Sequence, residues 1–315
     1  MIKELFNKIK EYNTIIIHRH TRPDLDALGS QIGLCKALKN VYPEKEIYMV
    51  GDESIKYAFM GNMDVIEDAK YENALVIICD VAVKHMVSDD RYTLAKEVYV
   101  IDHHKNDCDV TSNHIVDTSR VAAAEFIAHL LLENNIEITP DSATALYGGL
   151  VTDSGRFLYG ESLANTFEIA SKLIACGANA KFIYDNIYVE SLADKQMKNY
   201  FSNKVEFKEG VAYLKNDKEV FEMFPREFND ISRGMLSVMS GIEEIKIWLN
   251  FTYDVAKNAV IGEFRSRNVP IVDTAKKYGG GGHLLACGAT IADWDMVDKV
   301  IEDFVILLKE SENAS

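Results

Sequence analysis

Apolar residues in the N-terminal half of the chain form short continuous runs, separated by segments in which they recur every three or four residues. Continuous runs are typical of parallel strands covered on both faces by helices, and the longer spacing is typical of amphipathic helices. Strand-like runs cover 14–17, 47–50, 75–79 and 98–101. Helical spacing covers 1–12, 28–42, 122–133 and 142–151. The pattern predicts an α/β domain built on a parallel sheet.

The pattern changes in the second half of the chain. Residues 162–205 are helical in spacing, and they are rich in polar side chains after residue 190. Strand-like runs then cover 211–214, 245–249 and 260–264, and a helical stripe covers 294–309. We therefore expect a first domain over 1–190, a helical linker over 191–205 and a smaller α/β domain over 206–315.

Side chains of metal-ligand type follow the ends of three of the apolar runs. Because ligands bind at the carboxyl ends of strands in open α/β sheets, these side chains can share one crevice. They are His20, Asp24 and Asp26 after the first run, Asp80 after the third, and Asp102, His103 and His104 after the fourth. Asp153, at the end of a predicted helix, is a further candidate, although alone it is more typical of a helix C-terminus beside glycine.

The first of these clusters has a spacing that fits a metal site. Asp24 and Asp26 would point the same way in an extended segment, and a turn at Pro23 would bring His20 toward them. One nitrogen and two carboxylates suit Mn²⁺, Mg²⁺ or Fe²⁺ better than a thiophilic metal. The alternative is a solvated turn in which an aspartate caps the next helix.

Composition narrows the class of protein. The 315 residues are 48% hydrophobic and 26% charged, as in ordinary globular proteins. No apolar run approaches the roughly 18 residues of a membrane span, and the first residues are too charged for a signal sequence, so we expect a cytoplasmic protein without membrane contact. Five cysteines without C-x-x-C spacing indicate neither a disulfide framework nor a zinc ribbon. A net charge of −15 disfavours long nucleic acids, so any nucleotide partner is expected to be short.

Four motifs, in this order, resemble those of the DHH phosphoesterase family. They are the stretch 20–30, the strand-terminal Asp80, the triplet 102–104 and the segment 152–157. The glycine-rich segment 279–288 also resembles the signature of the DHH-associated domain. Within the family, the resemblance extends to short bacterial members that act as nanoRNases and 3′-phosphoadenosine-5′-phosphate phosphatases. Val81-Ala82 and Cys287 depart slightly from the usual pattern, which bears on substrate detail rather than on metal ligands.

The resemblance implies two divalent metal ions, with Mn²⁺ as the first expectation and Mg²⁺ or Fe²⁺ as alternatives. His20 and Asp24 would bind one ion, Asp26, His103 and Asp153 would bind the other, and Asp80 would bridge them. His104 would act beside the metals as an electrostatic or proton-transfer group. Asp102 would orient a neighbouring imidazole.

A phosphate-binding set is expected in the second domain. Guanidinium, hydroxyl, imidazole and backbone N–H groups are suited to holding phosphate. The candidates are Arg265, Ser266, Arg267, Gly281, Gly282 and His283, joined from the first domain by Arg156. For the glycines alone, a flexible turn is the simpler interpretation, and the segment lacks the Gly-Lys-Ser/Thr of a P-loop.

We therefore expect a two-metal hydrolase that degrades short oligoribonucleotides to mononucleotides and dephosphorylates 3′-phosphoadenosine-5′-phosphate. A phosphodiesterase for cyclic or linear dinucleotides, such as c-di-AMP or pApA, is the alternative within the family, and an inorganic pyrophosphatase is less favoured. A nucleotide sensor that binds without cleaving is the alternative from another class. The sequence leaves the oligomeric state open, with a homodimer among the options.

Overall fold

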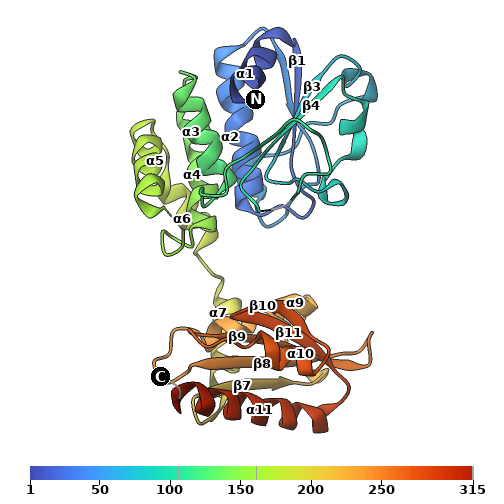
Figure 1. Cartoon of the computed structure of the whole chain (residues 1–315), viewed down its shortest axis with the longest axis vertical. Coiled ribbons are helices and arrows are strands. Elements are labelled where there is room, and N and C mark those ends of the chain that lie inside the picture. Colours follow the sequence, from blue (N-terminus) through green and yellow to red (C-terminus); the bar gives the residue numbers. More distant parts are fainter. Residues whose placement is uncertain (106, 161, 314–315) are drawn as a thin grey trace. The chain divides into compact units, whose positions relative to one another are not determined.

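A computed structural model describes residues 1–105, 107–160 and 162–313 of the chain. The chain divides into two compact units, Met1–Val189 and Glu190–Ser315, and each is described by itself (Figure 1). Within the described ranges, none of the helices combines the length and apolar character that a membrane span requires.

The first unit is built on a five-stranded parallel sheet, as the apolar runs predict. Its strand order is β2-β1-β3-β4-β5, so the order reverses between β1 and β3, where α/β sheets open a ligand crevice. Strand β5 was not expected, because it is three residues long and buries only Ile115. The strands are β1 (Thr14–His18), β2 (Glu46–Met49), β3 (Leu75–Cys79), β4 (Glu97–Asp102) and β5 (His114–Val116).

Helices cover one face of this sheet. Ile15 and Ile17 of β1 pack into the core on that face, whereas Ile16 joins a core on the other face with Tyr71 and Tyr92. The second face is covered by irregular segments and 3-10 helices, which corrects the expectation of helices on both faces. The α-helices of the unit are α1 (Ile2–Glu11), α2 (Leu25–Val41), α3 (Ala123–Glu133), α4 (Pro140–Asp153), α5 (Leu163–Ala175) and α6 (Ala180–Ile187). Its 3-10 helices are η1 (Ala58–Met60), η2 (Asp68–Lys70), η3 (Lys84–Met86) and η4 (Asp90–Leu94).

Helices α2 and α4 pack closely in antiparallel directions. A Cβ atom at Gly29 would lie 2.4 Å from the Ala145 carbonyl oxygen, so glycine is required for this approach. At the other end of the contact, the Lys36 ammonium lies 3.1 Å from the Asp141 carboxylate. The N-terminus of α2 therefore lies beside the C-terminus of α4, which ends at Asp153.

The second unit is built on a six-stranded mixed sheet of order β10-β11-β9-β8-β7-β6. Only β7 and β8 pair in parallel. The strands are β6 (Glu206–Lys208), β7 (Val211–Asn216), β8 (Ile247–Asp254), β9 (Ala259–Ser266), β10 (Gly281–His283) and β11 (Ala286–Ile291). The helices are α7 (Leu192–Lys204), α8 (Glu219–Met223), α9 (Phe228–Ser232), η5 (Gly234–Val238), α10 (Val272–Lys277) and α11 (Trp294–Asn313).

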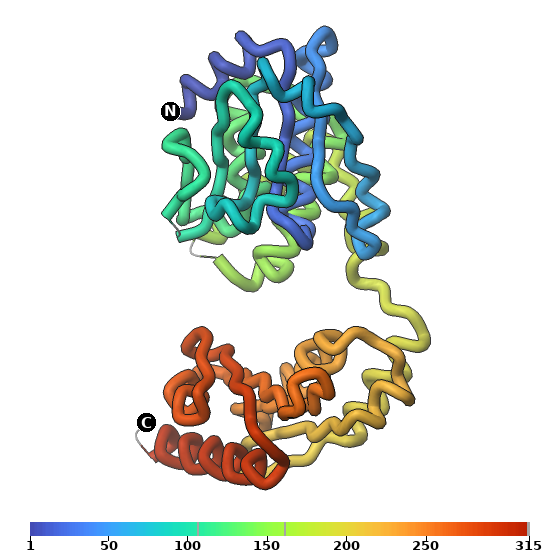
Figure 2. The backbone as a smooth tube through the Cα atoms, turned by 90° about the vertical axis from the view of Figure 1, so that its right-hand side faces the viewer, coloured from blue at the N-terminus to red at the C-terminus, as the bar shows by residue number. Residues whose placement is uncertain are grey.

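Helix α11 runs along one face of this sheet, as Figure 1 and Figure 2 show in red. Its Val297 and Phe304 are buried with Phe264 of β9. The opposite face is covered over β7 and β8 by α7, whose Met197 and Phe201 are buried there. Helix α7 thus packs within the second unit.

Strands β6, β10 and β11 were missing from the prediction made from apolar runs. Gly281, Gly282 and His283 of β10 are exposed, and β11 contains Gly288, so neither strand has a continuous apolar run. The glycine-rich segment that was expected to be a loop is therefore partly an edge strand, held by pairing with β11.

Candidate metal centre

The predicted metal ligands converge at the carboxyl ends of β1, β3 and β4. His20 lies two residues beyond β1, Asp80 directly follows β3, and Asp102 is the last residue of β4. The adjoining ends of α2 and α4 add Asp26 and Asp153. The crevice that was expected from the ends of the strands is therefore present in the structure.

Asp24 and Asp26 do not lie in an extended segment, which corrects that part of the prediction. Helix α2 begins at Leu25, and the Asp24 carboxylate accepts a hydrogen bond of 3.0 Å from the Ala27 N–H as its N-cap. Asp26 lies in the first helical turn and is buried. The two carboxylates consequently point to different neighbours, Asp24 to His20 and Asp26 to His103.

Asp80 lies between the two histidines. Its Oδ2 is 3.5 Å from His20 Nε2, and its Oδ1 is 3.5 Å from His103 Nε2. The backbone of Asp80 has φ +61°, a left-handed conformation that costs about 1–3 kcal/mol in a residue other than glycine. Such strain persists where the surroundings enforce it, and here it aims one carboxylate at two imidazoles.

The remaining ligand candidates divide into the two sets implied by the resemblance. His20 Nε2 lies 3.7 Å from Asp24 Oδ1 in the first set. In the second set, His103 Nε2 lies 3.7 Å both from Asp26 Oδ2 and from Asp153 Oδ2. Two ligand atoms of one ion lie roughly 3–3.5 Å apart when each metal bond is about 2.1 Å, so these separations are close to those of a bound site.

Backbone carbonyls fix the orientation of both imidazoles. Nδ1 of His20 lies 2.8 Å from the Thr21 carbonyl oxygen, and Nδ1 of His103 lies 3.2 Å from that of Arg120. When the imidazole is neutral, the Nδ1 that donates to a carbonyl carries the proton, so Nε2, which is directed at the carboxylates, is the nitrogen free to bind a metal.

Asp26 also joins the site to helix α3. Its two carboxylate oxygens accept hydrogen bonds of 2.7 and 2.8 Å from the N–H groups of Ala123 and Ala124, at the start of that helix. Each oxygen has a further lone pair for a cation. Asp26 is therefore held in place by the fold.

A buried ion pair supports the carbonyl that orients His103. The Arg120 guanidinium donates to the carboxylates of Asp117 and Glu125, both at 3.1 Å. Glu125 is buried and also accepts hydrogen bonds from the Val121 N–H at 3.0 Å and the Thr166 hydroxyl at 3.1 Å. The loop before α3 is thus fixed by charge-assisted hydrogen bonds.

Burial and mutual repulsion disfavour the ionised carboxylates when no cation is bound. Burial, with the charges of Asp80 and Asp153, raises the pKa of Asp26 well above its usual range. Burial, with the charges of Asp24 and Asp80, raises the pKa of Asp153 to about 7. Burial raises the pKa of Asp80 as well, although contact with His20 opposes this shift. A bound divalent cation would reverse these shifts, because it neutralises the repulsion.

Asp102 holds His104 rather than the metal ligands. Its Oδ1 accepts hydrogen bonds from the N–H groups of His103 and His104 and lies 2.8 Å from His104 Nδ1. The bond with Asp102 raises the pKa of His104 to about 9. The His104 ring remains half exposed, and Nδ1 is 3.5 Å from Asp80, so its free edge can meet a ligand in the crevice.

The donor set fits divalent cations. Among the residues that the structure describes, buried Asp80 Oδ1 and His103 Nε2 have no hydrogen-bond partner, as expected of atoms that bind a metal ion. Among the described residues, the groups whose ligand atoms lie close enough to hold a cation include His20 with Asp24 and Asp80, and Asp26 with His103 and Asp153. A third group, Asp80 with His103 and His104, overlaps both sets.

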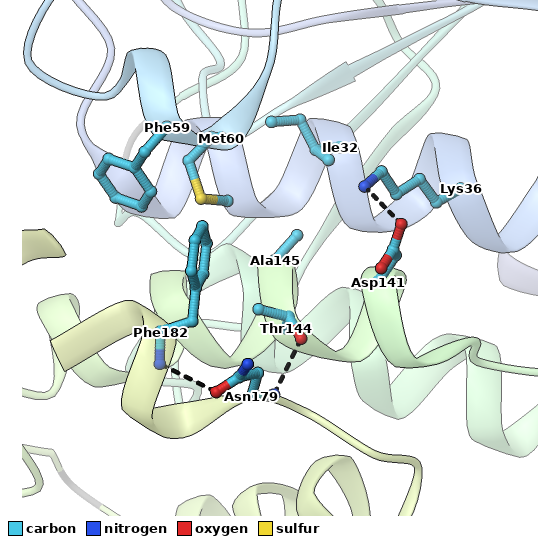
Figure 3. Close-up of a pocket in the computed structure, with 9 residues that line it drawn as sticks. All are labelled: Ile32, Lys36, Phe59, Met60, Asp141, Thr144, Ala145, Asn179 and Phe182. Carbon is cyan, nitrogen blue, oxygen red and sulfur yellow. Dashed lines mark hydrogen bonds and ion pairs between the residues drawn. The ribbon is translucent and has the colours of Figure 1, made fainter. Parts of the chain in front are cut away.

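A cavity of about 230 Å³ opens onto the ligands, lined by His20, Asp80, His104 and Asp153 among others. A second cavity of about 280 Å³ lies further along α2 and α4 (Figure 3). Its lining includes Phe59, Met60 and Phe182, and no predicted site residue belongs to it. The first cavity is therefore the candidate active site.

In the second unit, the strand register brings Arg265 and His283 onto one face of the sheet. His283 of β10 is opposite Ala286 of β11, and Ala286 is opposite Arg265 of β9. Directly opposed residues share a face, so both side chains lie away from the core that contains Phe264 and Cys287. Gly281 and Gly282 pair with Gly288 and Cys287 in the same ladder.

The other predicted phosphate ligands differ in availability. Arg265 donates to the Phe264 carbonyl at 2.8 Å and lies 3.5 Å from Glu263. The Ser266 hydroxyl is buried and donates to the Val269 carbonyl, so it is committed to the fold. Arg267 donates to the Ile242 carbonyl at 2.9 Å. In the first unit, Arg156 is exposed and stacks over the Tyr188 ring at 5.0 Å.

Sequence reasoning missed the groups that support the ligands. The carbonyls of Thr21 and Arg120 carry no sequence signal, because every residue has one. Glu125 has a weak signal, as a charged residue on the otherwise apolar face of 122–133. A charge at such a position indicates a buried ion pair.

Family models match both units. The model of the DHH family, N-terminal domain, matches residues 14–150, and that of the DHHA1 domain matches residues 217–310. A protein of Bacteroides fragilis described as exopolyphosphatase-related has a similar structure, with a TM-score of 0.81 and 21% identity over 98% of this chain and 97% of that one. This likeness concerns the fold.

Full-length relatives are found among curated proteins. A Bacillus subtilis protein named bifunctional oligoribonuclease and PAP phosphatase NrnA is 34% identical over 99% of this chain and 100% of its own length. A Mycoplasma pneumoniae protein of the same name is 32% identical over 96% of this chain and 95% of its own length. The resemblance inferred from the motifs is confirmed, and the chain belongs to the DHH family, with an N-terminal DHH domain and a C-terminal DHHA1 domain.

Proposed function

We propose that this protein is a metal-dependent phosphohydrolase that degrades short oligoribonucleotides to mononucleotides and dephosphorylates 3′-phosphoadenosine-5′-phosphate. The full-length relatives are named for these two activities. The observation that carries the proposal is the position of Asp80, whose two oxygens lie 3.5 Å from His20 and from His103. One carboxylate shared by two ligand sets is the arrangement that a two-metal phosphohydrolase requires.

In this proposal, His20 and Asp24 bind one cation and Asp26, His103 and Asp153 bind the other, with Asp80 bridging. The four carboxylates supply four negative charges, which balance two divalent ions. When bound, the ions supply a nucleophile at neutral pH and neutralise charge on the phosphoryl oxygens. We infer Mn²⁺ as the preferred ion, with Mg²⁺ or Fe²⁺ as alternatives, because mixed imidazole and carboxylate ligands suit these metals.

His104 is proposed as the group that assists the leaving oxygen. Its contact with Asp102 fixes the ring and favours the protonated imidazole, so the ring can donate a proton or stabilise negative charge at the edge of the crevice. Asp102 is proposed as its positioning residue.

Arg265 and His283 are proposed to bind a substrate phosphate. Both are on the sheet face of the second unit that is opposite to Phe264 and Cys287, and Gly281 and Gly282 leave that edge without side chains. Arg156 and Arg267 are proposed as further phosphate contacts. Ser266 was expected in this set, but its hydroxyl is buried and donates a hydrogen bond to the Val269 carbonyl, which supports a structural role.

A substrate panel tests the proposal. Purified protein is assayed with Mn²⁺ and with Mg²⁺ on RNA of two, five and 24 nucleotides, on 3′-phosphoadenosine-5′-phosphate, on pApA, on c-di-AMP and on pyrophosphate. We expect mononucleotide release from the RNA dimer and pentamer and phosphate release from the bisphosphate, with little action on the 24-mer. Asp80→Asn, which keeps the shape of the side chain but removes its charge, should be inactive on all substrates.

The same substrate panel distinguishes two alternative functions. Faster turnover of pApA or c-di-AMP than of RNA dimers would identify a dinucleotide phosphodiesterase. Tight binding of a dinucleotide without product release would identify a sensor, although such a protein has no need for the bridging carboxylate of a water-activating centre.

A further inference from the structure

The turn that follows α4 has an unusual backbone. Gly155, Arg156 and Phe157 all have left-handed φ values, +56°, +63° and +66°. The two residues that carry a Cβ atom each incur a cost of about 1–2 kcal/mol in this conformation. Hydrogen bonds hold the turn, because the Phe157 N–H donates to the Ser154 hydroxyl at 3.0 Å and the Arg156 N–H donates to the Val151 carbonyl at 2.8 Å.

This strained turn presents aromatic rings to solvent. The Phe157 ring stacks on the ring of Phe167 from α5, with centroids 4.9 Å apart and planes 16° apart. Phe167 is 53% exposed and Tyr159 is 67% exposed. The Tyr159 ring lies over Gly155, where an added Cβ atom would meet it at 2.4 Å. We call Phe157, Tyr159 and Phe167 the aromatic surface.

The turn that carries Phe157 and Tyr159 directly follows the candidate metal ligand Asp153 in the chain. Phe157 is four residues from Asp153, so it lies within about 14 Å of that ligand even for an extended chain. The turn folds back more tightly, since the Tyr159 N–H donates to the Ser154 carbonyl at 2.9 Å. Arg156, between the metal ligand and the rings, makes no ion pair within the part of the chain that the structure describes.

Exposed rings beside a phosphate-binding centre suit a nucleobase. Base stacking on aromatic side chains contributes about 1–3 kcal/mol per base and accepts any base, because every base has a π face. The guanidinium of Arg156, which stacks on the Tyr188 ring, keeps N–H donors that suit the phosphate of the same nucleotide.

We propose that the aromatic surface stacks against one nucleobase of the substrate whose phosphate is at the metal centre. This inference rests on the proposed function and deepens it, because it assigns residues that distinguish nucleotides from other phosphate esters. It predicts tolerance of all four bases and a preference for purines, which stack more strongly. A second copy of this chain is the competing occupant of an exposed apolar surface.

Kinetics of matched substrates test the assignment. Phe167→Leu and Tyr159→Leu remove a ring but keep apolar bulk, and Phe157 is left intact because it is partly buried. Substrates are an RNA dinucleotide and two analogues, each lacking one of the two bases. We expect kcat/KM on the dinucleotide to fall about 5- to 150-fold, mainly through KM, and to change little on one of the analogues. Tyr159→Phe should restore activity.

Phe207→Leu is the matched control, because Phe207 is 54% exposed in β6 and lies in neither the metal centre nor the aromatic surface. Equal losses on the dinucleotide and on both analogues would overturn the assignment, as would unchanged kinetics in both ring variants. Light scattering is measured in parallel. A wild-type dimer that becomes monomeric in Phe167→Leu would assign the surface to a subunit contact instead.

A binding assay separates this inference from the proposed function. A dinucleotide that contains 2-aminopurine is mixed with metal-free protein, and quenching of its fluorescence reports stacking without turnover. Quenching that is lost in Phe167→Leu supports the aromatic surface even if wild-type protein cleaves nothing, which would contradict only the proposed function. Absence of quenching with normal turnover would contradict only the aromatic surface.

Discussion

His103 Nδ1 lies 3.2 Å from the carbonyl oxygen of Arg120, and the guanidinium of the same arginine is fixed by the buried carboxylate of Glu125. The orientation of the proposed metal ligand His103 therefore depends on the ion pair between Arg120 and Glu125, neither of which is a proposed ligand.

Glu125→Gln is expected to weaken metal binding. Loss of the charge loosens Arg120, and changes to groups that orient metal ligands typically reduce affinity about 10- to 100-fold. Isothermal titration calorimetry of metal-free protein with Mn²⁺ measures this loss of affinity, which is expected for one of the two ions. Glu133→Gln on the same helix is the control, since Glu133 pairs with the partly exposed His129 on the surface of that helix. Unchanged affinity in Glu125→Gln at normal stability would contradict the positioning role.

The metal-free protein is expected to lose stability as pH rises. The pKa of Asp153 is raised from its usual range to about 7, so unfolding releases its proton and becomes easier between about pH 4 and pH 7. The pKa values of His20 and His104, raised to about 10 and about 9, act in the same direction above about pH 6.5. Thermal unfolding in EDTA should therefore give a lower Tm at pH 8.5 than at pH 5.5.

Saturating Mn²⁺ should abolish or reverse this trend, because the metal requires deprotonated carboxylates and neutral imidazoles. At 100 times its Kd, an ion adds about 2.7 kcal/mol to the free energy of unfolding. An identical pH profile with and without metal would mean that these residues do not bind it.

His104→Ala is expected to keep both ions and to slow hydrolysis about 10²–10⁴-fold, the range typical of a lost proton-transfer group. Metal content is measured by elemental analysis and turnover with an RNA dinucleotide. His129→Ala, on the outer face of α3, serves as the histidine control. Loss of one ion from His104→Ala would show that His104, rather than His103, is the ligand.

Arg265→Ala is expected to reduce kcat/KM on short oligonucleotides about 10- to 150-fold, because a hydrogen bond to a charged group contributes about 1.5–3 kcal/mol. Hydrolysis of bis-p-nitrophenyl phosphate, which has no second phosphate, should change far less. Arg226→Ala is the control, since Arg226 pairs with Asp194 on the surface. Equal losses on both substrates would show that Arg265 acts through the fold or the chemistry.

The sequence was sufficient to predict β1 to β4 of the first sheet and the convergence of His20, Asp80 and His103, because apolar runs mark where strands end. The orientation of Asp24 and Asp26 was predicted wrongly. Because Asp24 caps α2, the helix begins at Leu25, and Asp26 lies in its first turn instead of in an extended segment. Strands β10 and β11 were missed because glycine and exposed residues carry no apolar period. Strand β11 pairs with β9 and β10 pairs with β11, and these contacts are made only in the folded chain.

The most direct test of the two-metal account follows bound Mn²⁺ and product in one titration. Metal-free protein receives increasing Mn²⁺ in the presence of a labelled RNA dinucleotide, while electron paramagnetic resonance reports free Mn²⁺ and chromatography reports mononucleotide. The account predicts two ions per chain and release of mononucleotide only as the second ion binds. A single ion per chain at full activity, full activity in excess EDTA, or two bound ions without product would contradict it.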